Sequence, residues 1–214
     1  RLDTATGTLA FVTRVAVGAG EGYGVCGGTV EDDGSFTVYS AFKSGAIYRT
    51  GLQFIGGTLA DQTELLNKVP TQTEGCIYDP RTGMLYLGEE DVGIWAMYGR
   101  FEGGPENRKL VASIDNKVLV ADVEGLAIAP EGEEGGYLVA SSQGDNAYAV
   151  FRLPDMTPLG RFRIAKGTFG STEETDGIEL DNRDFGPDFP GGLFIAQDGM
   201  NAPQAQNFKY ARWD

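Results

Sequence analysis

The pattern that determines the fold is a glycine placed directly after an acidic or aromatic residue, and it recurs in four segments: Tyr23-Gly24-Val25-Cys26, Glu74-Gly75-Cys76-Ile77, Glu124-Gly125-Leu126-Ala127 and Asp176-Gly177-Ile178-Glu179. The glycines stand at 24, 75, 125 and 177, so their spacings are 51, 50 and 52 residues. A fixed period of this length indicates a repeat architecture, in which each unit buries its apolar surface only against its neighbours. Repeats are therefore expected to begin near residues 20, 71, 121 and 173.

Each repeat continues with short runs of β-forming residues bounded by Gly, Pro, Asn or Asp, which are typical of hairpin strands. The second runs are Ser35-Phe36-Thr37-Val38-Tyr39, Met84-Leu85-Tyr86-Leu87, Tyr137-Leu138-Val139-Ala140 and Leu193-Phe194-Ile195-Ala196. A third run follows in every repeat, and a fourth is expected at 110–114 and 160–164. No long helical period is present, and residues 59–66 are expected to form at most a short helical turn.

A period of about 50 residues with four strands per unit indicates a β-propeller, and a β-sandwich is the alternative. We predict an all-β fold in which residues 1–214 form one propeller domain with about four four-stranded blades. Residues 7–12 precede the first repeat and are expected to form an outer strand of a preceding blade. The last repeat ends near its third strand, so the spacing fits either a closed four-bladed ring or part of a larger one.

Composition excludes several kinds of chemistry. The 214 residues include 17 Lys+Arg, 31 Asp+Glu and no histidine, for a net charge of −14. Without histidine the chain has no Ser-His-Asp triad, no His-ligated zinc and no histidine base. The negative charge argues against nucleic-acid binding, which needs Lys and Arg, and against docking on an anionic membrane. A polyanionic substrate would bind only through bridging cations.

The sequence shows neither a membrane-spanning segment nor a cysteine motif. No apolar run approaches the roughly 20 residues of a transmembrane helix. Cys26 and Cys76 stand 50 residues apart without a CxxC motif, so we expect two buried small hydrophobic residues rather than a disulfide or a zinc site. The chain begins at Arg1 rather than Met, which suggests a processed or truncated N-terminus.

Carboxylates occupy the position before the repeated glycine in three of the four repeats. Equivalent positions on neighbouring blades lie at one height around the propeller axis. Asp122 stands two residues before Glu124, so strand alternation places both side chains on the same side of the strand. Converging carboxylates repel one another unless cations lie among them, and calcium prefers such oxygen ligands. The predicted calcium-binding acids are Glu74, Glu90, Asp122, Glu124 and Asp176. The alternative is a set of solvated acids and strand-end caps.

A second candidate calcium site lies in the last repeat and is less specific. Asp198 and Asn201 follow the second run of the last repeat and are a candidate structural calcium site. The same residues are equally typical of an Asx-turn.

Residues 72–213 resemble the β-propeller phytases, the calcium-dependent alkaline phytase family. The motifs that carry the resemblance are Gln72-Thr73-Glu74-Gly75, Glu89-Glu90-Asp91-Val92-Gly93-Ile94-Trp95, Ala121-Asp122-Val123-Glu124-Gly125-Leu126, Tyr137-Leu138-Val139-Ala140-Ser141-Ser142-Gln143-Gly144-Asp145-Asn146, Thr175-Asp176-Gly177-Ile178, Ala196-Gln197-Asp198-Gly199 and Gln206-Asn207-Phe208-Lys209. Residues 1–70 match more loosely, through Tyr23-Gly24 and Lys43-Ser44-Gly45.

The resemblance implies a six-bladed propeller that holds calcium at one mouth and removes phosphate from myo-inositol hexakisphosphate (phytate). It implies that the five predicted acids are the calcium ligands of the catalytic site and that Tyr23 and Lys43 contact substrate phosphates. Phytate would bind as its calcium complex, and a calcium-activated water would attack phosphorus without a covalent enzyme intermediate. A secreted or periplasmic location is the accompanying expectation.

The chain departs from the family pattern in two ways. It is shorter than the family's catalytic domain, so further blades would come from the rest of the chain or from an oligomer partner. The family also has a calcium-ligating Asp shortly before its Thr-Asp-Gly motif, whereas this chain has Phe169 and Gly170 there. Glu173 or Glu174 is a candidate substitute. The alternative function is therefore a non-catalytic calcium-binding propeller that serves structure or extracellular interaction.

Overall fold

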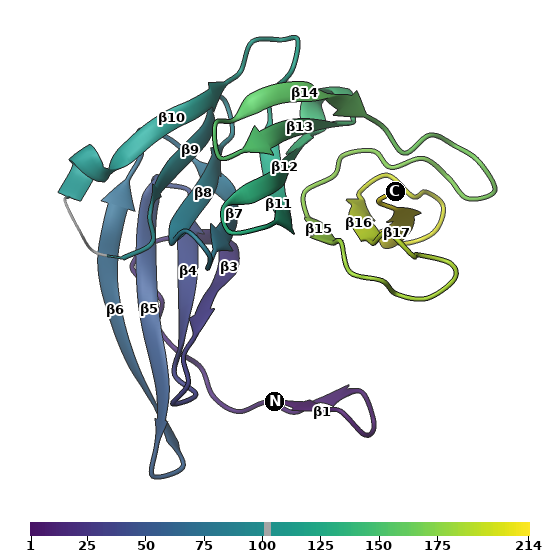
Figure 1. Ribbon diagram of the computed structural model, residues 1–214. Helices are drawn as coiled ribbons and strands as arrows, with labels where there is room; N and C mark the ends of the chain where they lie inside the picture. Colours follow the sequence, from purple (N-terminus) through teal and green to yellow (C-terminus); the bar gives the residue numbers. More distant parts are fainter. Residues whose placement is uncertain (101–103) are drawn as a thin grey trace.

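A computed structural model describes residues 1–100 and 104–214 and shows an all-β chain with four antiparallel meander sheets and one small two-stranded sheet near the N-terminus (Figure 1). Each meander sheet is one blade, and the strands of each blade follow in sequence order. Blade 1 contains β3 (Gly22–Val30), β4 (Phe36–Phe42), β5 (Ala46–Ile55) and β6 (Thr58–Lys68). Blade 2 contains β7 (Thr73–Asp79), β8 (Met84–Glu89), β9 (Gly93–Tyr98) and β10 (Arg108–Ser113).

Blade 3 contains β11 (Val123–Glu131), β12 (Gly135–Ser142), β13 (Ala147–Leu153) and β14 (Thr157–Phe162). Blade 4 contains β15 (Ile178–Asp181), β16 (Leu193–Asp198) and β17 (Asn207–Arg212). Short 3₁₀ turns, η1 (Gly104–Asn107) and η2 (Gln143–Asp145), complete the regular structure of the blades. The predicted four-blade propeller arrangement is confirmed.

The first strand of each blade lies innermost, because β3 contacts β7, β7 contacts β11, and β11 contacts β15. Apolar side chains fill the space between successive blades. Tyr39 and Leu85 belong to the core between blades 1 and 2, and Ile94 and Phe151 to the core between blades 2 and 3. This stacking explains why no single sheet needs a second layer of its own.

The repeated glycine is required by the close approach of neighbouring inner strands. A Cβ atom on Gly125 would lie 2.5 Å from the backbone oxygen of Asp176 in the next blade. On Gly24 and Gly75 it would lie still closer to the backbone oxygens of Glu74 and Glu124, respectively. The glycine of each of the first three repeats therefore packs against the acid of the following repeat, so the two residues recur together.

Residues 59–66 form a strand, and the prediction of a helical turn is wrong. They lie in β6, which pairs with β5 along its whole length, with Leu52 opposite Asp61. The turn between these strands is Gly56-Gly57, and both glycines have positive φ. Two consecutive glycines with positive φ suit a tight hairpin, so this pair is the signal that identifies the strand.

The two cysteines form a disulfide, and the prediction of two free thiols is wrong. Cys26 on β3 and Cys76 on β7 are bonded, with their Cα atoms 5.7 Å apart. Each cysteine closely follows the repeated glycine of its own blade. Because the inner strands of blades 1 and 2 are neighbours, residues one repeat apart meet, and the bond joins the two blades beside the axis.

The N-terminal segment also differs from its prediction. Within the described chain, Thr8–Leu9 (β2) pairs with Leu2–Asp3 (β1), so residues 7–12 do not form an outer strand of a blade. Figure 1 shows this small hairpin lying apart from the four blades. Among the described residues, no helix is long and apolar enough to cross a membrane.

Candidate functional site

Three predicted acids meet at one end of the inner strands. Glu74 and Glu124 are the second residues of β7 and β11, and Glu90 directly follows β8. One carboxylate oxygen from each of these residues lies within 4.8 Å of the others. The repeat therefore brings together side chains that are 50 residues apart in the sequence.

The other two predicted acids, Asp122 and Asp176, flank this group and interact with it electrostatically. Burial is the main cause that raises the pKa of Glu124 to about 7, and the charge of Asp176 adds to the rise. Glu124 is only 4% exposed. Burial raises the pKa of Asp122, and the charges of Glu90, Asp91 and Glu174 add to this. Negatively charged carboxylates are thus close together at this end of the inner strands, and their mutual repulsion contributes to the raised pKa values of Asp122 and Glu124.

Glutamine side chains hold these acids in place, a role that the sequence analysis missed. Gln72 donates from Nε2 to Glu74 Oε1 over 3.3 Å and also to Glu90 Oε1. Gln143 Nε2 donates to Asp176 Oδ1 over 2.8 Å. Burial raises the pKa of Asp176, and the bond from Gln143 opposes that rise. Gln72 and Gln143 stand in two of the motifs that carry the family resemblance, residues 72–75 and 137–146, so both residues are visible in the sequence although their role is not.

Glu89, beside Glu90, was also missed, and it is fully buried (0% exposed). Its carboxylate accepts hydrogen bonds from the backbone N–H and the hydroxyl of Thr71, each over 2.6 Å, and from Trp95 Nε1 over 2.7 Å. These hydrogen bonds connect Thr71, in the segment before β7, with Glu89 at the end of β8 and Trp95 in β9. Glu89 therefore fixes the segment that carries Gln72 and, because it directly precedes Glu90, also the end of β8 from which Glu90 follows.

Tyr23 and Lys43, the predicted substrate contacts, lie together in blade 1. Lys43 Nζ is 4.6 Å from the ring centroid of Tyr23 and 2.8 Å from Glu21 Oε1. The hydrogen bond to Glu21 raises the pKa of Lys43, and the charges of Glu21 and Glu90 add to the rise. Lys43 is therefore a partly exposed cation on the same side of the propeller as the carboxylates.

Asp198 lies in a different environment from the three clustered acids. Its buried carboxylate pairs with Lys209 over 3.0 Å and accepts hydrogen bonds from the backbone N–H groups of Glu173 and Met200. The bond from Met200, two residues on, has the form of an Asx-turn. Asp198 thus holds the loop before Asp176, and its charge is matched by a lysine.

Two hollows of different character lie at opposite ends of the strands. Tyr23, Glu74, Glu124 and Asp176 line a hollow of about 230 Å³ on the axis. A larger hollow of about 1130 Å³ lies between the outer parts of blades 2 and 3, at the other end of their strands. We place the candidate site at the smaller hollow, because two of the three clustered carboxylates, Glu74 and Glu124, line it.

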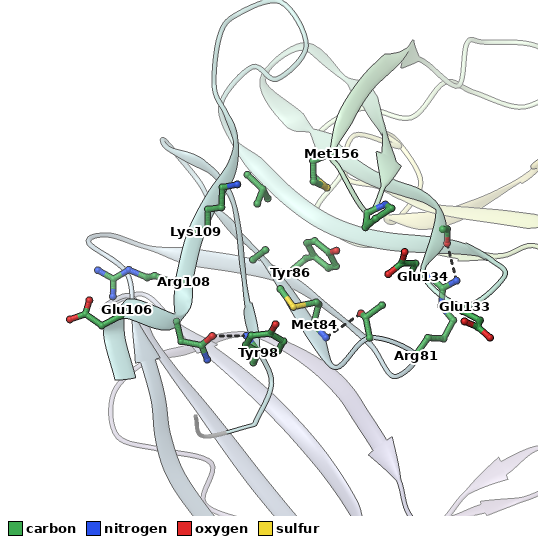
Figure 2. Close-up of a pocket in the computed structure, with 16 residues that line it drawn as sticks. Arg81, Met84, Tyr86, Tyr98, Glu106, Arg108, Lys109, Glu133, Glu134 and Met156 are labelled. Carbon is green, nitrogen blue, oxygen red and sulfur yellow. Dashed lines mark hydrogen bonds between the residues drawn. The ribbon is translucent and has the colours of Figure 1, made fainter. Parts of the chain in front are cut away.

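Figure 2 shows the larger hollow. Glu133 and Glu134 lie on one side of it, Arg108 and Lys109 on the other, and Tyr86 between them. Arg81, which also lines it, is held by Asp79 and by the carbonyl of Gly135.

Comparison with known proteins gives the family. The family model described as Phytase matches residues 19–214. A curated 3-phytase from Bacillus subtilis (strain 168) is 36% identical over 203 residues, which cover 84% of this chain and 51% of that protein. The chain thus spans about half the length of this relative.

A solved structure supports the fold alone. The WD40 β-propeller domain of Doa1 matches with a TM-score of 0.55 and 12% identity, over 90% of this chain and 51% of that one. The sequence family and the blade architecture agree with each other. The chain therefore belongs to the phytase family, in its β-propeller form.

Proposed function

We propose that this protein is a calcium-dependent phosphomonoesterase that hydrolyses phytate. Family membership and a relative named 3-phytase support the substrate class. The observation that carries the calcium dependence is the cluster of Glu74, Glu90 and Glu124 oxygens within 4.8 Å of one another.

The donor set fits calcium in both spacing and chemistry. Calcium binds oxygen ligands at 2.3–2.6 Å, so two ligands of one ion lie at most about 5 Å apart. The observed 4.8 Å limit falls within that span, and all three donors are carboxylates. The raised pKa of Glu124 reflects burial and uncompensated repulsion, which a bound cation would relieve.

Calcium at this cluster would neutralise substrate phosphate and lower the pKa of a bound water. The protein's own part is to hold the cluster in shape. Gln72 orients Glu74 and Glu90, while Gln143 orients Asp176. Lys43 would donate to a substrate phosphate in place of its present partner Glu21, with Tyr23 packed beside it.

Glu174 is our candidate for the family's missing Asp ligand. Its charge acts on Asp122, where it contributes to the raised pKa, whereas Glu173 accepts a hydrogen bond from Ser171. Phe169, where the family pattern would place an Asp, is exposed. Glu174 thus supplies negative charge to the Asp122 side of the cluster.

The net charge and the disulfide fit the wider proposal. Because the chain carries a net charge of −14, a densely anionic substrate would approach it as a calcium complex. A disulfide between blades 1 and 2 accords with a secreted or periplasmic location, where disulfides persist.

The test is phosphate release from phytate by the full-length protein, in calcium and in EDTA. We expect release in calcium, none in EDTA, and a loss of at least tenfold in Glu124→Gln. Glu131→Gln, at the far end of β11, is the matched control and should retain activity. Absence of release at every calcium concentration would overturn the proposal.

The missing Asp favours one alternative, a calcium-binding propeller without catalytic activity. In that case Glu124→Ala would weaken calcium binding and stability, and no phosphate release would be found in the unmodified protein. Calcium binding by calorimetry together with the phosphate assay separates the two functions.

A further inference from the structure

The larger hollow, between the outer parts of blades 2 and 3, has no part in the proposed function. Its volume of about 1130 Å³ slightly exceeds the roughly 300–1,000 Å³ that is usual for small-molecule sites. It lies at the other end of the strands from the clustered carboxylates, so an occupant of this hollow would not touch them.

Apolar side chains form part of its lining. Met84 on β8, Val111 on β10 and Met156 in the turn before β14 all line the hollow. Each of them also packs on the core between blades 2 and 3, so the surface that they offer is held in place. Methionine adapts its shape to its neighbours, and such a lining suits a bulky apolar side chain.

Tyr86 on β8 adds a buried hydroxyl group to this lining. The residue is only 5% exposed, and its hydroxyl makes no hydrogen bond with the part of the chain that the structure describes. Figure 2 shows it directed toward the side of the hollow that carries Glu134. Burial raises the pKa of Tyr86, so the hydroxyl keeps its proton at neutral pH and can donate or accept. Buried polar groups nearly always have a partner, so this one points to a ligand that supplies it.

Two of the cations around the hollow are already engaged by the protein. Arg81 pairs with Asp79 over 2.8 Å. Arg108 donates to Asn67 Oδ1 over 2.9 Å. Neither guanidinium group is therefore available to balance further negative charge.

The other charged side chains of the lining make no hydrogen bond or ion pair among residues 1–100 and 104–214; they are Glu106, Glu133, Glu134 and Lys109. Three acids against one lysine leave two negative charges without a counterpart. Figure 2 shows Glu133 and Glu134 on one side of the hollow and Lys109 on the other. The hollow is therefore complementary to a cationic ligand that also has an apolar part.

We propose that this hollow binds a short extended peptide of another protein in which arginine or lysine alternates with a bulky apolar residue. Successive side chains of an extended peptide point to opposite sides, so the apolar ones can face the methionines while the cations reach Glu133 and Glu134. A peptide carbonyl or N–H group would pair with the hydroxyl of Tyr86. The proposal does not depend on phosphatase activity, because the clustered carboxylates take no part in it.

The first experiment titrates the full-length protein with the peptide acetyl-Leu-Arg-Leu-Arg-amide in a calorimeter. We expect Glu133→Gln/Glu134→Gln to weaken binding about tenfold, because two exposed ion pairs are lost. Lys109→Gln should strengthen it about twofold, because a repelling charge is removed.

The matched control is Asp32→Asn/Asp61→Asn, which removes two exposed acids of blade 1 that do not line the hollow. This variant should bind the peptide like the unmodified protein. Equal weakening in both double variants would show a general attraction to the acidic chain and overturn the proposal. Failure of the unmodified protein to bind the peptide would overturn it as well.

The second experiment tests the apolar lining and the hydroxyl separately. Acetyl-Gly-Arg-Gly-Arg-amide has the same charge but no bulky apolar side chain, and it should bind at least about tenfold more weakly. Tyr86→Phe keeps the ring and should weaken binding of the leucine peptide about fivefold, with thermal unfolding confirming a folded protein. Equal affinities for the two peptides, or unchanged binding in Tyr86→Phe, would refute the peptide site.

Two further measurements exclude other places and other occupants. The affinity should be the same in calcium and in EDTA, whereas binding that is lost in calcium would place the peptide at the clustered carboxylates and overturn the proposal. Sedimentation of the protein alone tests whether a second copy fills the hollow. Self-association that Glu133→Gln/Glu134→Gln abolishes would assign the hollow to that second copy instead.

Discussion

Glu124 and Asp176 belong to neighbouring blades, and their charges interact across the junction of β11 and β15. The backbone N–H of Gly125 donates to the carbonyl of Asp176 over 2.7 Å, which keeps the two acids close. Burial and the charge of Asp176 together raise the pKa of Glu124 to about 7. In the absence of a cation, the cluster therefore costs the protein stability.

The first prediction is that Glu124→Gln stabilises the calcium-free protein at pH 8. The folded-state pKa of about 7 exceeds the ordinary value of 4.5, so the folded state binds the proton more tightly. The free energy of unfolding must then fall as the pH rises from about 4.5 to 7. At 1.36 kcal/mol per pKa unit, the variant should gain about 1–3 kcal/mol at pH 8 and nothing at pH 4.

Urea unfolding in EDTA at several pH values measures this difference. Calcium should reverse the order, because it stabilises the unmodified protein by binding only the folded state. Glu134→Gln, which removes an exposed acid at the other end of the strands, should behave like the unmodified protein. A less stable Glu124→Gln protein in EDTA at pH 8 would contradict the interpretation of this cluster.

The second prediction compares glycines at equivalent repeat positions. Gly75→Ala would force a methyl group against the backbone oxygen of Glu124, and backbone yields less easily than a side chain. We expect a loss of about 3 kcal/mol or more, or failure to fold. Gly177→Ala should change stability by less than about 0.5 kcal/mol, because no described atom lies within 4 Å of its added Cβ. Chemical unfolding of both variants checks this, and equal losses would refute the packing argument.

The third prediction concerns the buried carboxylate of Glu89. Glu89→Gln keeps the shape of the side chain but brings an amide group toward Thr71 and Trp95, which are donors. At least one of the three donors should lose its acceptor, at a cost of about 2–3 kcal/mol. Thermal unfolding measures the loss, and altered tryptophan fluorescence should accompany it. Unchanged stability and fluorescence would show that these hydrogen bonds contribute little.

The fourth prediction concerns the bond between blades 1 and 2. Cys26→Ala should lower the free energy of unfolding by about 2–4 kcal/mol, since the bond closes a loop across 50 residues. A Cys26→Ala/Cys76→Ala double variant should lose no more than the single variant, because both remove the same bond. Unfolding with and without reductant is the measurement. Insensitivity of the unmodified protein to reductant would argue against the bond.

Much of the site was predictable, because the repeat places its acids before a glycine. Glu74 and Glu124 occupy the repeated position, and the structure brings them together with Glu90. The roles of Gln72 and Gln143 were not predictable, since an amide pairs with a carboxylate only when both side chains turn toward each other. Nor was the ion pair of Asp198 with Lys209, which depends on the pairing of β16 with β17.

The amino-acid sequence by itself determined the period, the β-strand content and the position of the acids within each repeat. These features are visible along the chain because close packing demands glycine locally and strands demand β-forming residues locally. Tertiary structure alone decided that Cys26 meets Cys76 and that Glu89 is buried among three donors. The reason is physical: such contacts join residues brought together by strand register and blade stacking, and neither is expressed in the identity of one residue.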